Sequence, residues 1–134
     1  MVSGRPPGKH GVKRATTIRR KADFNRLYSS GKRYHTPLLT AVILRRGDDE
    51  PACRVAYVVG RKVARQAVIR NRVRRRLREA YRSLGGPLEG GADLALIAHP
   101  AAAAADYWGL RAALGKALER AGLLSLAPPG GGAG

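Results

Sequence analysis

The sequence predicts one small domain, an α+β or α/β sandwich in which helices pack against a single sheet. Three observations support this. The chain has 134 residues, which suits one domain with a modest core. Its apolar residues alternate in some segments and recur every three or four positions in others. These segments follow one another in the order helix, strands, basic helix, strand, helix, and no internal repeat interrupts them.

A first short helix is predicted from Lys21 to Ser30. Phe24, Leu27 and Tyr28 stand at positions i, i+3 and i+4, so they share one helix face. Gly31 follows directly and supplies a stop signal.

Three apolar segments are predicted to be strands. Residues 34–45 are rich in Thr, Val, Ile and Leu, and a turn at 47–51 separates them from a second segment at 53–59. We expect these two to form an antiparallel pair. Residues 92–98 form a short apolar strand that is expected to be buried on both faces. In the second strand, one face carries Val55, Tyr57 and Val59.

The last predicted helix covers residues 107–121. Asp106 is a suitable N-cap, and Gly122 suits the residue after the helix end. The expected buried stripe consists of Trp108, Leu110, Leu114 and Leu118.

The predicted domain spans residues 18–124. Residues 1–17 are basic and rich in Gly and Pro, so a flexible arm is expected, without the apolar stretch of a secretory signal. Residues 125–134 are of low complexity and are expected to be disordered. Cys53 is the only cysteine, which excludes a disulfide within the chain and fits a reducing cytoplasm. No apolar run approaches the roughly 18–20 residues of a membrane span.

The charge is large and unevenly distributed. The formal net charge is +17; residues 1–82 hold 23 basic and five acidic residues (+18), and residues 83–134 hold three basic and four acidic ones (−1). Such asymmetry indicates a nucleic acid or an anionic membrane as partner. Arg outnumbers Lys 20 to 6. This favours nucleic acid, because the guanidinium group pairs with phosphate in a bidentate manner and stacks on bases.

The most strongly charged segment runs from Arg61 to Arg82, where ten of 22 residues are basic and one is acidic. A helix is expected from about residue 64 or 67 to 84, ended by residues 85–87. Val68 alone among its apolar residues points to the charged side, so it is expected in the first turn or beneath another element. The helix's apolar stripe consists of Ile69, Val73, Leu77, Ala80 and Leu84.

Two other interpretations of this helix fit less well. A solvated helix face usually alternates positive and negative charges, and this face does not. A helix that lies on lipid carries Trp, Phe or several Leu on its apolar side, whereas this stripe is small and β-branched. The pattern favours a cationic rod that packs on a sheet and contacts phosphates from two directions.

The core of this helix, Arg70-Asn71-Arg72-Val73-Arg74-Arg75, is preceded by Val59-Gly60-Arg61-Lys62 and followed by Arg78-Glu79-Ala80-Tyr81. This pattern resembles the signature of the bacterial ribonuclease P protein subunit, and the order of elements agrees from about residue 17 to 124. The resemblance implies a single α+β domain in the order αβββαβα, with helices packed on a sheet of about four strands. It also implies a left-handed βαβ crossover, as in the fold type named after domain 2 of ribosomal protein S5.

The resemblance further implies a function. The family's protein binds a catalytic RNA and the 5′ leader of precursor tRNA, and it assists the RNA-catalysed endonucleolytic removal of that leader in the cytoplasm. Mg²⁺ is then held by the RNA, and neither a membrane nor an obligatory protein partner is expected. Phe24 and Tyr28 match the aromatic pair of the leader cleft; for Phe24, plain core packing is the alternative. The positions that match RNA contacts are Arg61, Lys62, Arg65, Arg70, Asn71, Arg72, Arg74, Arg75 and Arg78.

The chain departs from the family pattern at three positions. Gly60 stands where a small polar residue is common, so a hydroxyl contact is absent. Tyr28 replaces a frequent Phe. His99 stands where Arg or Lys is often found, which removes a fixed positive charge.

No catalytic or metal-binding group is expected in the protein itself. The acidic residues Asp48, Asp49 and Glu50 cluster only in a predicted turn, and the three histidines are far apart in the sequence. Two other functions stay open on the residues alone. One is a ribosomal or assembly protein of similar fold; the other is a DNA-binding regulator, although no helix-turn-helix pair is present.

Overall fold

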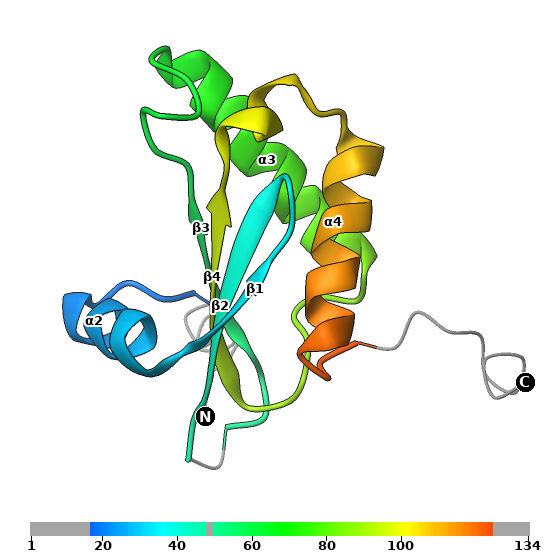
Figure 1. The fold of residues 1–134 in the computed structure, drawn as a ribbon. Coiled ribbons are helices and arrows are strands. Elements are labelled where there is room, and N and C mark those ends of the chain that lie inside the picture. The colour runs from blue at the N-terminus through cyan, green and yellow to red at the C-terminus, as the bar shows by residue number, and fades with distance from the viewer. Residues whose placement is uncertain (1–16, 48–49, 125–134) are drawn as a thin grey trace, which may run out of the picture.

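The computed structural model describes residues 17–47 and 50–124 (Figure 1). The arm and tail predicted at the two ends lie outside these residues, except for Thr17, which bridges to Val55. The elements follow the order αβββαβα implied by the resemblance, with a short 3₁₀ helix, η1, before the last helix. They are α2 (Lys21–Ser30), β1 (Lys32–His35), β2 (Leu39–Arg45), β3 (Arg54–Val58), α3 (Ala67–Ser83), β4 (Ala92–Ala98), η1 (Pro100–Ala104) and α4 (Tyr107–Arg120).

The four strands form one mixed sheet in the order β1-β2-β4-β3. β2 pairs antiparallel with β1 and β4, whereas β3 pairs parallel with β4. The predicted antiparallel pair of segments 34–45 and 53–59 is therefore wrong, because β4 lies between β2 and β3. β4 is buried on both faces as predicted, and a strand of this kind favours a central position with a partner on each side.

The predicted single strand at 34–45 is also wrong, because it is two strands joined by a short turn. Pro37 has no N–H for a ladder and interrupts the run. The Thr36 hydroxyl donates to the Leu39 carbonyl at 2.7 Å and accepts from the Leu39 N–H at 3.0 Å. These local hydrogen bonds replace ladder bonds and turn the chain back on itself.

Helices cover both faces of the sheet, so the molecule has three layers (Figure 1). α3 and α4 pack on one face over the larger core, and α2 packs on the other over a smaller one. The two-residue period of β3 divides its side chains as predicted. Val55 and Tyr57 face α3, whereas Ala56 joins the α2 side.

The last helix has the predicted ends. The Asp106 side chain accepts a hydrogen bond from the Gly109 N–H at 2.8 Å, and Gly122 follows the helix with a φ of 78°. Leu110, Leu114 and Leu118 are fully buried. Trp108, however, is 68% exposed, so its predicted place in the stripe is wrong. At about 100° per residue it lies some 200° from Leu110, on the opposite side of the helix.

No helix in the described part of the chain combines the length and the apolar character that crossing a membrane requires.

Candidate nucleic-acid interface

The basic helix is anchored by the predicted apolar stripe. Of its members, Val73, Leu77 and Ala80 are fully buried and Leu84 nearly so, whereas Ile69 is only half-buried; Tyr81, at the flank of the stripe, is also nearly buried. The helix begins at Ala67, which places exposed Val68 in the first turn, one of its two expected positions. Packing of this stripe against the sheet turns the remaining circumference of α3 outward.

That outward surface carries seven arginines and one glutamate, a net charge of +6 over 17 residues. Within the part of the chain that the structure describes, the ion pairs join Asp23 or Asp93 to Arg26, Arg46 and Arg54. None of them involves α3. The carboxylates of residues 17–47 and 50–124 therefore leave the charge of this helix for an external anion.

Two arginines of α3 are held by uncharged oxygen atoms. Arg70 donates to the carbonyls of Ala64 (3.0 Å) and Arg65 (2.6 Å), so it fixes the segment that leads into the helix. Arg74 donates to the Asn71 side-chain oxygen at 2.8 Å. These contacts orient the guanidinium groups without cancelling their charge.

Two further arginines are held by neighbouring elements. Arg76 donates to the Ala105 carbonyl at 2.8 Å, which ties α3 to the segment before α4. The Arg78 guanidinium lies over the Tyr57 ring, 5.5 Å from its centroid. Burial raises the pKa of the Tyr57 hydroxyl well above its usual range, and the adjacent Tyr81 raises it further. Tyr57 is therefore uncharged at neutral pH, and its contact with Arg78 is a cation–π interaction.

The structure places the predicted RNA-binding residues along one stretch of surface. Arg61, Lys62 and Arg65 are exposed on the turn between β3 and α3. On the helix, Asn71, Arg72, Arg75 and Arg78 are exposed, whereas Arg70 and Arg74 are half-buried. No predicted member of this group is lost to the core.

The predicted aromatic pair lies on the opposite face of the sheet. Phe24 and Tyr28 are half-buried on α2, with ring centroids 6.0 Å apart and planes tilted by 35°. Both pack against the smaller core, which includes Leu27, Val42 and Ala95. Burial raises the pKa of the Tyr28 hydroxyl, and nearby Arg33 partly opposes this effect. Each ring is thus partly core and partly surface.

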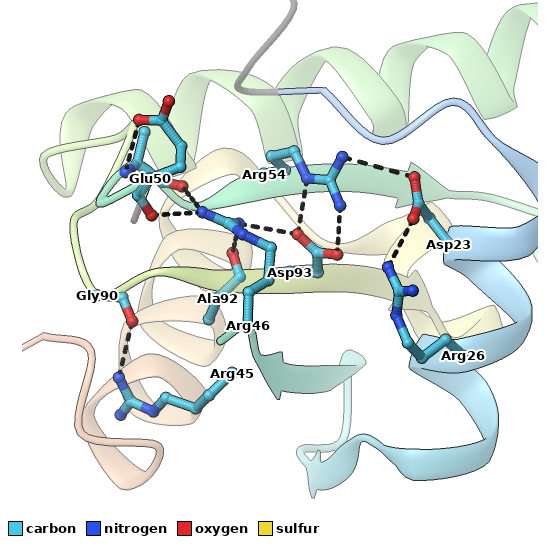
Figure 2. A network of polar contacts seen from close by, with 10 residues as sticks. Asp23, Arg26, Arg45, Arg46, Glu50, Arg54, Gly90, Ala92 and Asp93 are labelled. Atoms are coloured by element: carbon cyan, nitrogen blue, oxygen red, sulfur yellow. Dashed lines mark hydrogen bonds and ion pairs between the residues drawn. The ribbon is translucent and has the colours of Figure 1, made fainter. Parts of the chain in front are cut away.

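Sequence reasoning missed the polar network that joins α2 to the sheet (Figure 2). Asp93 on β4 is 1% exposed, and its carboxylate accepts from Arg46 at 2.9 Å and from Arg54 at 2.8 and 2.7 Å. Arg54 also lies 3.5 Å from Asp23 on α2, which pairs with Arg26 at 2.7 Å. The signal was a lone acid within the apolar run Ala92–Ala98.

This network lies beside a basic cleft of about 1010 Å³ near the start of α2. Arg54 is held so firmly by Asp93 that its pKa is raised above its already high usual value. Arg46 is similarly occupied, by Asp93 and by three backbone carbonyls. Much of the charge in this cleft is therefore structural. The arginines that line it are Arg19, Arg20, Arg26, Arg45, Arg46 and Arg54.

Two of the chain's three histidines meet at the other end of the sheet. His35 Nδ1 and His99 Nε2 lie 2.8 and 2.7 Å from the hydroxyl of Thr40, which is nearly buried. His99 thus has a structural partner at the position where the resemblance expects a cation.

Among residues 17–47 and 50–124, no three His, Cys, Asp or Glu side chains are grouped so that they can hold a metal ion. Asp48, Asp49 and His10 lie outside the described residues. Cys53 is buried, and burial raises the pKa of its thiol. The described surface is rich in guanidinium groups, which can bind anions.

Comparison with known proteins agrees with this geometry. The sequence model of the family Ribonuclease P matches residues 12–122. A ribonuclease P protein component from Xanthomonas euvesicatoria is 40% identical over 118 residues, covering 87% of this chain and 79% of that protein. One from Desulfovibrio desulfuricans is 39% identical over 109 residues, covering 80% and 83%.

Solved structures share the fold. The ribonuclease P protein from Thermotoga maritima superposes with a TM-score of 0.68 at 26% identity, covering 78% of this chain and 96% of that one. The Staphylococcus aureus protein has a TM-score of 0.73 at 22% identity, covering 83% and 99%. The α+β fold, the cationic α3 and the match over most of the sequence lead to one assignment: this chain belongs to the ribonuclease P protein family.

Proposed function

We propose that this protein is the RNA-binding subunit of a ribonuclease P ribonucleoprotein that removes the 5′ leader of precursor tRNA. The observation that carries the proposal is the +6 surface of α3, which no carboxylate in the described part of the chain neutralises. Folded RNA supplies the dense phosphate charge that such a surface requires.

α3 and the preceding turn bind the catalytic RNA. Their exposed guanidinium groups pair with phosphates and displace condensed counterions, so the affinity depends on salt. Because α3 is anchored by buried Val73, Leu77, Ala80 and Tyr81, these groups are presented on a rigid element, which lowers the entropic cost of binding.

The α2 face of the sheet holds the single-stranded leader. Phe24 and Tyr28 offer partly exposed rings, and aromatic stacking accepts any base, at about 1–3 kcal/mol per base. A leader of variable sequence is suited to this kind of contact.

The chemistry takes place on the RNA. RNA phosphates would hold the Mg²⁺ ions, and the chemistry that these ions would supply is an activated water and stabilisation of the leaving oxygen. The protein screens repulsion between RNA segments and positions the leader, which raises substrate affinity. The reducing compartment expected from the single buried cysteine is the cytoplasm.

A reconstitution assay tests the proposal. Purified protein is added to the catalytic RNA and precursor tRNA at low Mg²⁺, and the RNA without protein at the same Mg²⁺ concentration is the control. We expect a marked gain in cleavage at the mature 5′ end. A protein that binds RNA but gives no gain would instead be a ribosomal or assembly protein, and preference for a specific DNA duplex would indicate a DNA-binding regulator.

A further inference from the structure

A groove of about 510 Å³ lies between the segment that enters α3 and the short helix η1. η1 lies beside the first turns of α3, at the same end of the molecule (Figure 1). Of its lining residues, we call the apolar Val63, Ile69, Ala103 and Ala104 the floor, and the polar Arg65, Gln66 and Arg72 the rim.

The floor is apolar and open to solvent. Val63 is nearly buried, Ile69 and Ala103 are half-buried, and Ala104 is exposed. The η1 residues that line the groove are alanines, so this side of the groove is shallow and a flat group can lie against it. Such open apolar surface is unfavourable in water, so a ligand that covers it gains free energy in proportion to the area removed from solvent.

The rim offers polar groups that the protein does not use. Within the described residues, Arg65, Gln66 and Arg72 have no side-chain hydrogen bond or ion pair. Gln66 is the N-cap residue of α3, but its side chain does not cap the helix. Its amide therefore has a donor and an acceptor for an incoming group.

The shape of the groove does not depend on a ligand. Arg70 donates to the carbonyls of Ala64 and Arg65, and the Val63 N–H donates to the Gly60 carbonyl at 3.1 Å. These bonds fix the segment that carries Val63 and Arg65. The site is thus preorganised, which lowers the cost of binding.

We propose that this groove holds one unstacked nucleobase of the catalytic RNA, with the adjoining phosphates on Arg65 and Arg72. This rests on the proposed function. The π face of the base covers the apolar floor, and the Gln66 amide pairs with its polar edge. An apolar peptide would leave both arginines unpaired, and a lipid chain would require a longer apolar surface. Two cations beside a short apolar floor suit a nucleotide.

The test fills the groove without removing a charge. Ala104→Phe places a ring in the groove, and Ala112→Phe makes the same change on the exposed side of α4 as a control. Full-length proteins are titrated with the catalytic RNA at several salt concentrations, and thermal unfolding verifies that both variants fold. We expect Ala104→Phe to weaken binding by about tenfold or more with an unchanged salt slope, because a stacked base and not a phosphate is displaced.

Arg72→Ala provides the contrasting result. It should weaken binding and also lower the salt slope by about 0.7–0.9. The groove assignment is overturned if Ala104→Phe binds like Ala112→Phe, if its salt slope falls, or if only the later binding of precursor tRNA weakens. In each of these cases, weaker RNA binding and a lower salt slope for Arg72→Ala would still support the proposed function. If the unaltered protein fails to bind the catalytic RNA, the proposed function itself is wrong.

Discussion

At the scale of single residues, the presence of a carboxylate partner decides whether the charge of an arginine stabilises the fold or is available to a ligand. Arg54 is committed to the fold, because Asp93 holds it with two hydrogen bonds. Arg72 has the same chemistry but has no carboxylate partner within the described residues. Sequence alone treats the two arginines alike, and the ion-pair geometry separates them.

Removing the buried carboxylate should destabilise the protein strongly. Asp93→Asn removes the buried carboxylate that Arg46 and Arg54 share, and loss of one partner of a buried pair typically costs about 3–5 kcal/mol. The free energy of unfolding is measured by urea titration, with Glu119→Gln on the exposed side of α4 as a control for the lost charge. A cost below about 1 kcal/mol would show that the network contributes little.

The exposed tryptophan should matter little for stability. Trp108→Ala removes a side chain that is 68% exposed, whereas Leu114→Ala opens a cavity in the core, at about 2–5 kcal/mol. Thermal unfolding of the two variants compares them directly. An equal loss of stability would mean that Trp108 is packed in solution.

At the scale of elements, α3 and α2 present different chemistry on opposite faces of the sheet. α3 presents guanidinium groups, which pair with phosphate. α2 presents the tilted ring pair of Phe24 and Tyr28, which suits stacking. One helix is therefore suited to folded RNA and the other to a flexible single strand.

Arg72 is a cleaner probe of α3 than Arg70. Arg70→Ala would also free the segment that leads into the helix, since Arg70 holds two of its carbonyls. Arg72→Ala should lower affinity for the catalytic RNA about three- to tenfold while leaving the unfolding temperature unchanged. Lys116→Ala on α4 removes one charge elsewhere and serves as the matched control. Equal effects of the two variants would mean that only total charge matters.

Phe24→Ala should reduce the preference for precursor over mature tRNA. The loss of one stacked ring corresponds to about 1–3 kcal/mol, and only the precursor carries a leader. Affinities of the assembled complex for the two tRNAs measure this preference, and Phe24→Tyr keeps the ring as a control. If affinity falls equally for both tRNAs, Phe24 only packs against the core.

At the scale of the whole molecule, the three layers place the cationic surface of α3 and the aromatic surface of α2 on opposite faces of the sheet. The sheet separates the two surfaces, and β4 at its centre touches both cores. Positions on β2 and β3 alternate in the same way, so these three strands carry side chains of both cores. In the proposed function, the catalytic RNA and the leader would therefore bind on opposite faces of the sheet.

The affinity of the complete protein for the catalytic RNA should fall steeply with salt. Each neutralised phosphate adds about 0.7–0.9 to the slope of log K against log[salt], so contact through five or more cations gives a slope of several units. Filter binding between low and moderate salt measures it. A nearly flat slope would contradict an interface dominated by phosphate.

The sequence by itself determined the features that depend on neighbours along the chain. Periodicity and capping rules predicted three such features: the stripe of Val73 and Leu77, the apolar run of β4 and the Asp106 cap. Each of them depends only on residues a few positions apart in the sequence. The resemblance to the family signature also supplied the expected RNA-binding residues. The structure leaves all of these residues exposed or half-buried.

Only the tertiary structure decided features that depend on residues far apart in the sequence. The position of β4 between β2 and β3 is one, because strand order follows from non-local hydrogen bonds that no local pattern encodes. The partners of Asp93 are another, since they come from β3 and the end of β2. Burial of a helix face is set by what packs on it, and for that reason Trp108 lies in solvent while Leu110 lies in the core.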